Sequence, residues 1–351
     1  MLEGKTYCPI LHTRVAEMQA LEMLPAASKE AVFPLIVARP WPNANQLVNT
    51  WNRIQTAFGE RRFALDLDPF KYGAVRDKPA GRAFDALFDP ANGHASYYEQ
   101  VRDLDHAVPV LQFHNGVLLD LDRQAAHINE INRGAVLRLE HGSSLQPIQT
   151  LESVIGAVDD LALWIDLGWR RDLLTIQPWA SALLDIIGRG SPESEVVVSG
   201  SSFPDSFSPV ERDVVRARER ELYDDLVRRH NAVQIKYGDW GSTRAPRAPT
   251  PMRVVKRIDL PTPRDWVCFR DVGDETYQGI AERTVNDPSW PEGINIWGTY
   301  LIQGTAEAVP GSIRGQAAAA AARINIHLYR QAHYGGDAVF GDADEPFTDD
   351  F

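Results

Sequence analysis

The stretch RFALDLD, residues 62–68, decides the fold. Its apolar residues alternate with Ala64, Asp66 and Asp68, so an extended strand would place both carboxylates on one side. Two like charges on one face of a buried strand are costly unless that face meets cations or solvent. The stretch therefore predicts a strand with one apolar face and one face that becomes polar toward its carboxyl end.

Seven further runs have a similar β-forming composition, at residues 8–13, 32–39, 107–114, 135–141, 161–168, 195–202 and 232–239. Between most of them, apolar residues recur every three or four positions, which predicts helices at 14–24, 45–58, 96–104, 123–133, 151–161 and 179–189. Strands that alternate with helices indicate right-handed βαβ units and a parallel sheet.

Eight such units within residues 1–241 predict an α/β protein of the closed (β/α)₈ TIM barrel type. The alternative is an open, doubly wound sheet, which normally carries a Gly-rich phosphate loop after its first strand. Here the first strand runs into HTRVAEM, residues 12–18, which contains no glycine. We therefore expect the barrel.

The pattern changes after the eighth strand. Residues 242–335 predict a β-hairpin, from 252–260 and 265–272, followed by closing helices near 276–286 and 312–333 that pack on the barrel. Residues 209–231 predict a long, charged surface helix. Residues 336–351 end in GDADEPFTDDF and predict an acidic, flexible tail. The tail and the charged helix are the candidate surfaces for a protein partner, and the alternative for the tail is that it only makes the protein more soluble.

Composition excludes several classes of function. The net charge of -12 over 351 residues argues against non-specific binding to nucleic acid or to an anionic membrane. The two cysteines, Cys8 and Cys268, exclude a disulfide framework and a multi-cysteine zinc site. With no visible signal peptide and no apolar run of roughly 18 residues, we expect a cytoplasmic location and no membrane span.

Polar residues recur with one parity toward the carboxyl end of strand after strand. In a barrel these side chains point inward, at the end where chemistry collects. They predict a polar pocket at the barrel mouth formed by His12, Arg39, Asp66, Asp68, Gln112, His114, Arg138, Glu140, Asp166, Ser199, Ser201 and Asp239. On the eighth strand the pattern leaves open whether Lys236 or the pair Tyr237 and Asp239 points inward.

The residue types suggest a division of roles. Four carboxylates are candidates for acid–base catalysis or for holding Mg²⁺: Asp66, Asp68, Glu140 and Asp166. We expect no other cofactor. His114 is a further catalytic candidate, and His12, Gln112 and Asp239 are candidate ligand contacts. Arg39 and Arg138 would bind phosphate or carboxylate. The alternative is a buried ion-pair network that only satisfies the barrel interior.

Two Gly/Ser-rich loops follow the seventh and eighth strands. They are SGSSFPDS, residues 199–206, and YGDWGSTR, residues 237–244. The loops after these two strands are a frequent phosphate site in (β/α)₈ barrels, and backbone N–H groups in such turns favour anions. Ser199, Ser201 and Gly238 would position the anion. Ordinary turn chemistry is the alternative.

Several short motifs resemble the protein beta family of bacteria and phages. They are YCPILHTRVAEMQALEML (7–24), VFPLIVAR (32–39), IDLG (165–168), SGSSFP (199–204) and YGDWGS (237–242). INIHLYRQAHYG (324–335) is similar to a region of that family that is often richer in adjacent histidines. The similarity spans residues 7–335. It implies a setting near mobile and defence-related genes, and it supplies no catalytic residues.

Two functional hypotheses follow. The first is an enzyme acting on a small anionic, phosphate-bearing ligand, as a Mg²⁺-dependent hydrolase of a phosphodiester bond or as a hydrolase of a glycosidic bond. The second is a non-catalytic ligand-sensing or protein-interaction subunit of a phage-defence or phage-encoded assembly. Solvent-connected carboxylates at the barrel mouth favour the enzyme, whereas carboxylates fully paired with Arg39 and Arg138 favour the second hypothesis.

Overall fold

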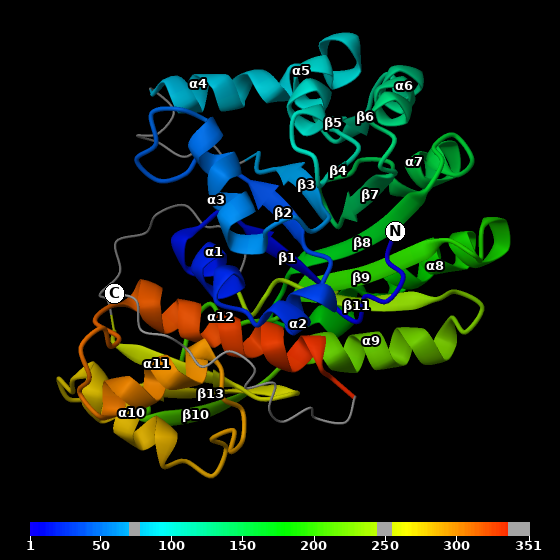
Figure 1. The fold of residues 1–351 in the computed structure, drawn as a ribbon. Coiled ribbons are helices and arrows are strands. Elements are labelled where there is room, and N and C mark those ends of the chain that lie inside the picture. The colour runs from blue at the N-terminus through cyan, green and yellow to red at the C-terminus, as the bar shows by residue number, and fades with distance from the viewer. Residues whose placement is uncertain (70–77, 244–254, 336–351) are drawn as a thin grey trace.

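A computed structural model describes residues 1–69, 78–243 and 255–335 (Figure 1). The predicted tail, residues 336–351, lies outside these ranges, so its flexibility and its partner remain predictions. The core of the fold is an eight-stranded parallel sheet with the order β4-β3-β2-β1-β11-β9-β8-β7. Its strands are β1 (Cys8–His12), β2 (Leu35–Ala38), β3 (Phe63–Leu67), β4 (Ala107–Pro109), β7 (Ala135–Glu140), β8 (Leu161–Trp169), β9 (Glu195–Ser201) and β11 (Ile235–Asp239).

The two edges of the sheet meet, so the sheet is nearly closed and barrel-like. Val110, just after β4, bridges Val136 of β7, and the Leu111 N–H donates to the Val136 carbonyl at 2.9 Å. Within this sheet, each strand lies beside the strand that precedes it in the chain. The last strand, β11, in addition pairs with the first, β1. Each of the eight predicted runs contributes a strand to the sheet. The parallel strands in chain order and the contact between the two edges confirm the prediction of an α/β protein with a barrel-like sheet.

One predicted strand is shorter than expected. The run 107–114 ends its sheet pairing at Pro109, and Phe113–His114 instead form β5, which pairs with β6 (Val117–Leu118) in a small hairpin. Asn115 and Gly116 both have positive φ, which is the geometry of the tight turn that Asn-Gly favours. The assignment of His114 to an inward-facing strand position was therefore wrong.

Helices cover the outer face of the sheet. They are α1 (Val15–Glu22), α2 (Ala26–Glu30), α3 (Val48–Phe58), α4 (Pro79–Asp85), α5 (Ala91–Arg102), α6 (Leu121–Ile131), α7 (Pro147–Val154) and α8 (Gln177–Gly190). One apolar cluster joins helices to outward strand residues such as Ile36, Leu65 and Leu137. A second fills the interior with residues of the opposite parity, including Leu35 and Trp164. The predicted alternation of inward and outward residues is thus confirmed.

The C-terminal region adds a second small sheet and three helices. The predicted hairpin is β12 (Arg257–Pro261) with β13 (Asp265–Arg270), and β10 (Arg212–Arg216) joins it in the antiparallel order β10-β13-β12. The helices are α10 (Tyr277–Val285), α11 (Trp297–Ala306) and α12 (Gln316–Ala332). Helix α12 connects this region to the barrel, because Ile326 packs with the small sheet while Ile324 and Leu328 pack in the barrel core.

The prediction of one surface helix over residues 209–231 was wrong in two ways. Residues 212–216 form β10, and only Arg218–Arg229 form helix α9. RDVVR contains two adjacent β-branched residues, and exposure alternates along it in the structure, which fits an edge strand better than a helix. Helix α9 is also partly buried, since Arg220 is 5% exposed.

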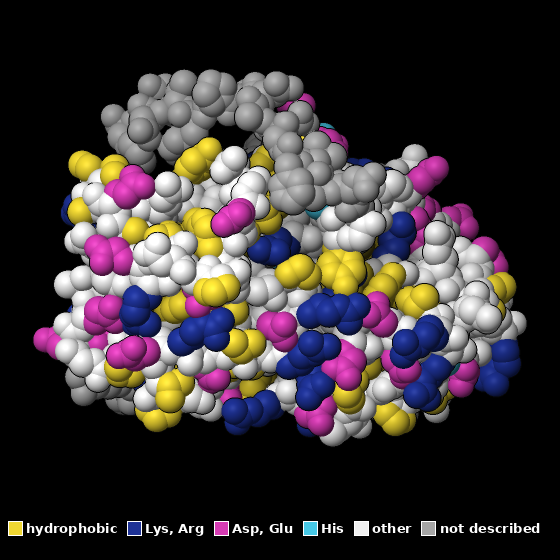
Figure 2. Space-filling model, turned by 90° about the horizontal axis from the view of Figure 1, so that it is seen from below, with side chains coloured by type: hydrophobic (Ala, Val, Ile, Leu, Met, Phe, Trp, Pro, Cys, Tyr) yellow, Lys and Arg dark blue, Asp and Glu magenta, His cyan; other side chains and the backbone are white. Residues whose placement is uncertain are grey.

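The exposed charges of α9 are largely paired within the molecule. Arg228 and Arg229 both contact Asp225, and Arg264 contacts Asp224 at 2.7 Å. Figure 2 shows basic and acidic side chains intermixed over this side of the molecule. Such a surface has no strong single-sign field to attract a charged partner. Within the described ranges, no helix is long and apolar enough to cross a membrane.

Candidate functional site

Arg138 lies at the centre of a cluster at the carboxyl ends of β3, β7 and β8. Its guanidinium donates to Asp66 Oδ2 at 2.9 Å and to Asp166 Oδ2 at 2.7 Å, and lies 3.3 Å from Glu140 Oε2. These three strands place alternate residues inward, which is why residues 28 and 72 positions apart meet. The structure therefore brings together four of the residues predicted from the sequence.

Asp166 is the rigid member of this cluster. Its side chain is 0% exposed, and its second oxygen, Oδ1, accepts from the Gly168 N–H at 3.0 Å and from Trp240 Nε1 at 2.9 Å. Trp240 and Trp164 both belong to the interior apolar cluster, so they form an apolar floor beneath the charges. Asp166 therefore fixes Arg138 in place.

Glu140 is the most exposed member, with 35% of its side chain accessible. Burial is the largest effect on its pKa, which is raised to about 6. The positive charge of Arg138 lowers the pKa, whereas the negative charges of Asp166, Asp66 and Asp68 raise it further. Gly168 leaves space beside it, because a Cβ built there would lie 3.9 Å from Glu140 Oε1. Glu140 is thus a solvent-accessible carboxyl that can carry a proton near neutral pH.

The raised pKa of Glu140 has a consequence for stability. Between the ordinary value of 4.5 and about 6, the unfolded chain has lost this proton while the folded chain keeps it, so stability falls as the pH rises through that range. We expect Glu140→Gln to remove this fall. After allowance for solvent screening, the effect should be at most about 1 kcal/mol.

The measurement is the free energy of unfolding of both proteins at several pH values between 4 and 7. Burial also raises the pKa of Glu219, to about 7, but that contribution cancels when the variant is subtracted from the parent protein. A difference between the two proteins that stays constant over this range would contradict the raised pKa.

Comparison with known proteins places the chain in a family. The model of the Beta protein family matches residues 7–333. The chain belongs to the Beta protein family. It is also 26% identical, over 361 aligned residues and 98% of each chain, to Protein beta of Enterobacteria phage P4. The resemblance in the sequence motifs is thereby confirmed, and it covers the whole barrel-like sheet and α12.

Other predicted residues also lie at the mouth. Gln112 Nε2 is 3.4 Å from Asp66 Oδ1. Asp68 is buried, and its negative charge contributes to the raised pKa of Glu140. Arg39 is half-buried just after β2, where its N–H donates to Thr13 Oγ1. His114 is not among the hydrogen-bond or ion-pair partners of Arg138, which are Asp66, Glu140 and Asp166 in the described part of the chain.

His12 lies beside Trp240, with ring centroids 5.7 Å apart. Its Nδ1 is 3.5 Å from Glu17 Oε2, and its N–H donates to the same carboxylate. Glu17 is buried, which alone would raise its pKa, but Arg14 and His12 lower that pKa to about 2. Glu17 was not predicted as a site residue, because it lies in helix α1 and the prediction considered only polar residues near the ends of strands.

The serine hydroxyls that were predicted to position the anion form hydrogen bonds within the protein. Ser199 Oγ accepts from Trp164 Nε1 at 2.9 Å, and Ser201 Oγ donates to the Thr243 carbonyl. Gly238 faces the interior, where a Cβ would lie 2.5 Å from the Cys8 carbonyl oxygen. These contacts support the alternative of structural turn chemistry for both loops.

Asp239 faces the opposite way from the prediction. Its carboxylate accepts from the hydroxyls of Tyr7 and Tyr237 and lies 2.7 Å from Nε2 of His327 on α12. Tyr7 and Tyr237 belong to the outer, helix-facing cluster. Because Gly238 points inward, its neighbour Asp239 must point outward. Its predicted place in the mouth pocket was therefore wrong.

The arrangement of the carboxylates also bears on the metal prediction. Within residues 1–69, 78–243 and 255–335, no group of three or more His, Cys, Asp or Glu side chains is arranged to hold a metal ion. The Arg138 guanidinium occupies the space between Asp66, Glu140 and Asp166 that a cation would need. Mg²⁺ held by Asp66, Asp68, Glu140 and Asp166 remains an untested prediction, and these contacts do not favour it.

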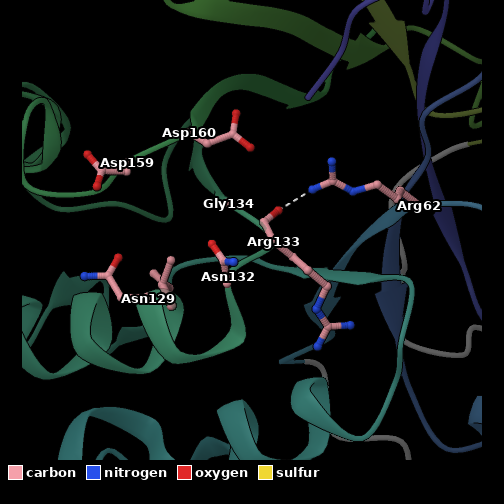
Figure 3. Close-up of a pocket in the computed structure, with 8 residues that line it drawn as sticks. Arg62, Asn129, Asn132, Arg133, Gly134, Asp159 and Asp160 are labelled. Carbon is pink, nitrogen blue, oxygen red and sulfur yellow. Dashed lines mark hydrogen bonds between the residues drawn. The ribbon is translucent and has the colours of Figure 1, made fainter.

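A separate cavity lies at the other end of the barrel-like sheet (Figure 3). It measures about 540 Å³ and is lined by residues that precede β3, β7 and β8, and by the end of α6: Arg62, Ile128, Asn129, Asn132, Arg133, Gly134, Asp159 and Asp160. Arg62 donates to the Arg133 carbonyl across it. None of the predicted site residues lines this cavity.

Proposed function

We propose that the protein is a cytoplasmic hydrolase in which Glu140 transfers protons at the carboxyl end of a TIM-type barrel. The observation that carries this proposal is the state of Glu140, which is partly exposed and has a pKa raised to about 6 among carboxylates that are themselves held by Arg138. General acids and bases work best when their pKa lies near the working pH.

The other members of the cluster would position Glu140. Asp166 and Arg138 are buried and hydrogen-bonded, so they define where the Glu140 carboxyl lies. When protonated, Glu140 would donate to the leaving oxygen of the substrate, and when ionised it would accept a proton from the attacking water. Asp66, at 15% exposure, is the second carboxylate within reach of such a ligand.

We infer a small anionic ligand, as the sequence indicated, but not one bound by Arg138. Three carboxylates already neutralise that guanidinium, so it offers no free charge to an anion. An anionic group must therefore bind at the rim of the mouth, with the bond to be hydrolysed placed over Glu140.

Two contacts favour the second hypothesis, a non-catalytic ligand-sensing or protein-interaction subunit. Asp166 is completely buried and all the described hydroxyls predicted to hold the anion have partners within the protein. A site in which Glu140 is accessible and Asp66 only slightly so can bind a ligand without reacting with it. The activity measurement decides between the two.

The test uses chromogenic substrates: bis(4-nitrophenyl) phosphate, 4-nitrophenyl phosphate and 4-nitrophenyl glycosides. If the proposal holds, Glu140→Gln lowers the rate on the substrate that is hydrolysed by about 100-fold or more. The matched control is Glu152→Gln, at an exposed position of α7, which should change the rate by less than about twofold. Equal rates for the parent protein and Glu140→Gln would contradict the proposal.

A further inference from the structure

Two residues outside the predicted set lie at the same edge of the sheet as Glu140. His141 follows β7 directly, and its N–H donates to the Asp166 carbonyl at 2.7 Å. Arg170 follows β8, and its N–H donates to the Ser201 carbonyl at 2.9 Å. Both backbone positions are therefore fixed by bonds to the neighbouring strand, and both side chains begin at the rim of the mouth.

The two side chains contact each other. Arg170 Nη2 lies 3.4 Å from His141 Nδ1, and the His141 ring meets Trp179 edge to face with centroids 5.1 Å apart. If Nδ1 accepts from Arg170, the neutral ring carries its proton on Nε2, which is then a donor. Burial, and then the charge of Arg170, lower the pKa of His141. The pair thus presents hydrogen-bond donors and one positive charge.

Among the residues that the structure describes, no carboxylate forms an ion pair with this positive charge. Within the described ranges, the polar side-chain contact of Arg170 is that with His141, whereas Arg138 nearby contacts three carboxylates. The closest acidic residue in sequence, Asp172, uses its Oδ1 to accept from the Leu174 N–H at 3.1 Å. In a chain of net charge -12, an exposed guanidinium at the edge of the sheet that carries the candidate catalytic carboxyl is informative.

We propose that Arg170 and His141 bind the phosphoryl group of the ligand. This inference rests on the proposed function for the identity of the reactive bond, but the binding step can be measured without it. The planar guanidinium matches two phosphoryl oxygens, and the imidazole supplies a third donor. Gly168, two residues before Arg170, lies beside Glu140 Oε1. His141 directly follows Glu140 in the chain, so the proposed phosphoryl site lies at the same edge of the sheet as Glu140.

Inorganic phosphate is the probe for this site. We expect added phosphate to shift the NMR resonances of the His141 ring in the full-length protein and to raise its apparent pKa, because a bound anion favours the imidazolium. Arg170→Gln should weaken phosphate binding at least about tenfold. The matched control is Arg189→Gln, an exposed arginine at the far end of α8, which should leave binding unchanged.

Acetate provides the chemical comparison. If acetate perturbs His141 as strongly as phosphate does, the assignment to a phosphoryl group is overturned. If phosphate leaves the His141 titration unchanged, or if Arg189→Gln weakens binding as much as Arg170→Gln, the site itself is overturned. Phosphate binding that depends on Arg170, together with unchanged hydrolysis in Glu140→Gln, would support this site and reject the proposed hydrolase instead.

Discussion

Replacing Arg138 with alanine is expected to lower the free energy of unfolding by about 3–5 kcal/mol. The variant leaves Asp166, which is 0% exposed, and Asp66, which is 15% exposed, without their cation. Removing one partner of a buried ion pair leaves an uncompensated charge in a region of low dielectric, which costs more than the pair itself contributes. Urea unfolding at pH 7 measures the difference.

The control is Arg102→Ala. Arg102 pairs with Glu130 at 2.6 Å, but the two side chains are 44% and 63% exposed, so this loss should be below about 1 kcal/mol. A loss of the same small size for Arg138→Ala would mean that water reaches the carboxylates freely. In that case the cluster would be a solvent-filled pocket, and Arg138→Ala should instead weaken ligand binding.

The Arg138 cluster could be predicted because it depends on a regular pattern. Side chains on a strand alternate, and closing the sheet places the same parity of every strand inside. Asp66, Arg138, Glu140 and Asp166 each follow apolar interior residues of their own strands, so the prediction needed only strand positions. The exact pairing, with Arg138 held by three carboxylates rather than facing a ligand, depends on distances that no sequence pattern encodes.

Other parts of the site depend on local irregularities. Arg170 was missed because β8 has a register shift between Asp166 and Trp169, with Gly168 at φ +68°, so parity no longer predicts where its side chain points. His141 was missed because it shares the parity of Leu137 and Leu139, which face outward, and only inward polar residues were taken as candidates. For His114, the signal was present and was overlooked, since Asn115-Gly116 is a strong indicator of a hairpin turn. Glu17 lies in a helix, and only the tertiary structure shows its contact with His12.

Asp239 shows the limit of reasoning from one strand. On β11, Tyr237 and Asp239 lie on one face of the strand, and Lys236 and Gly238 lie on the other. The residue types of either pair are compatible with the interior of the barrel or with its outer, helix-covered face. The deciding contact is His327, 88 residues away on α12. A long-range pair of this kind leaves no periodic trace in the sequence, so the buried acceptor was mistaken for a ligand contact.

Asp239→Ala should therefore act on stability, with an expected loss of about 3–5 kcal/mol. The carboxylate is 2% exposed and accepts from Tyr7, Tyr237, the Gly241 N–H and His327, so its removal leaves several buried donors without a partner. Burial would raise its pKa, but His327 and the two hydroxyls lower it overall. The carboxylate thus stabilises the fold above its ordinary pKa, and this contribution is lost as the pH falls through the lowered value.

Two further variants separate this structural role from a ligand contact. Tyr7→Phe removes one of the donors and should cost about 1 kcal/mol, while Asp103→Ala, at an exposed position just after α5 with an ordinary backbone conformation, should change stability by less than about 0.5 kcal/mol. Phosphate binding at His141 should be unchanged in Tyr7→Phe, because Tyr7 packs in the outer cluster, away from the mouth. If Asp239→Ala unfolds at the same urea concentration as the parent protein, these donors have other acceptors, and the carboxylate at β11 is free for another role.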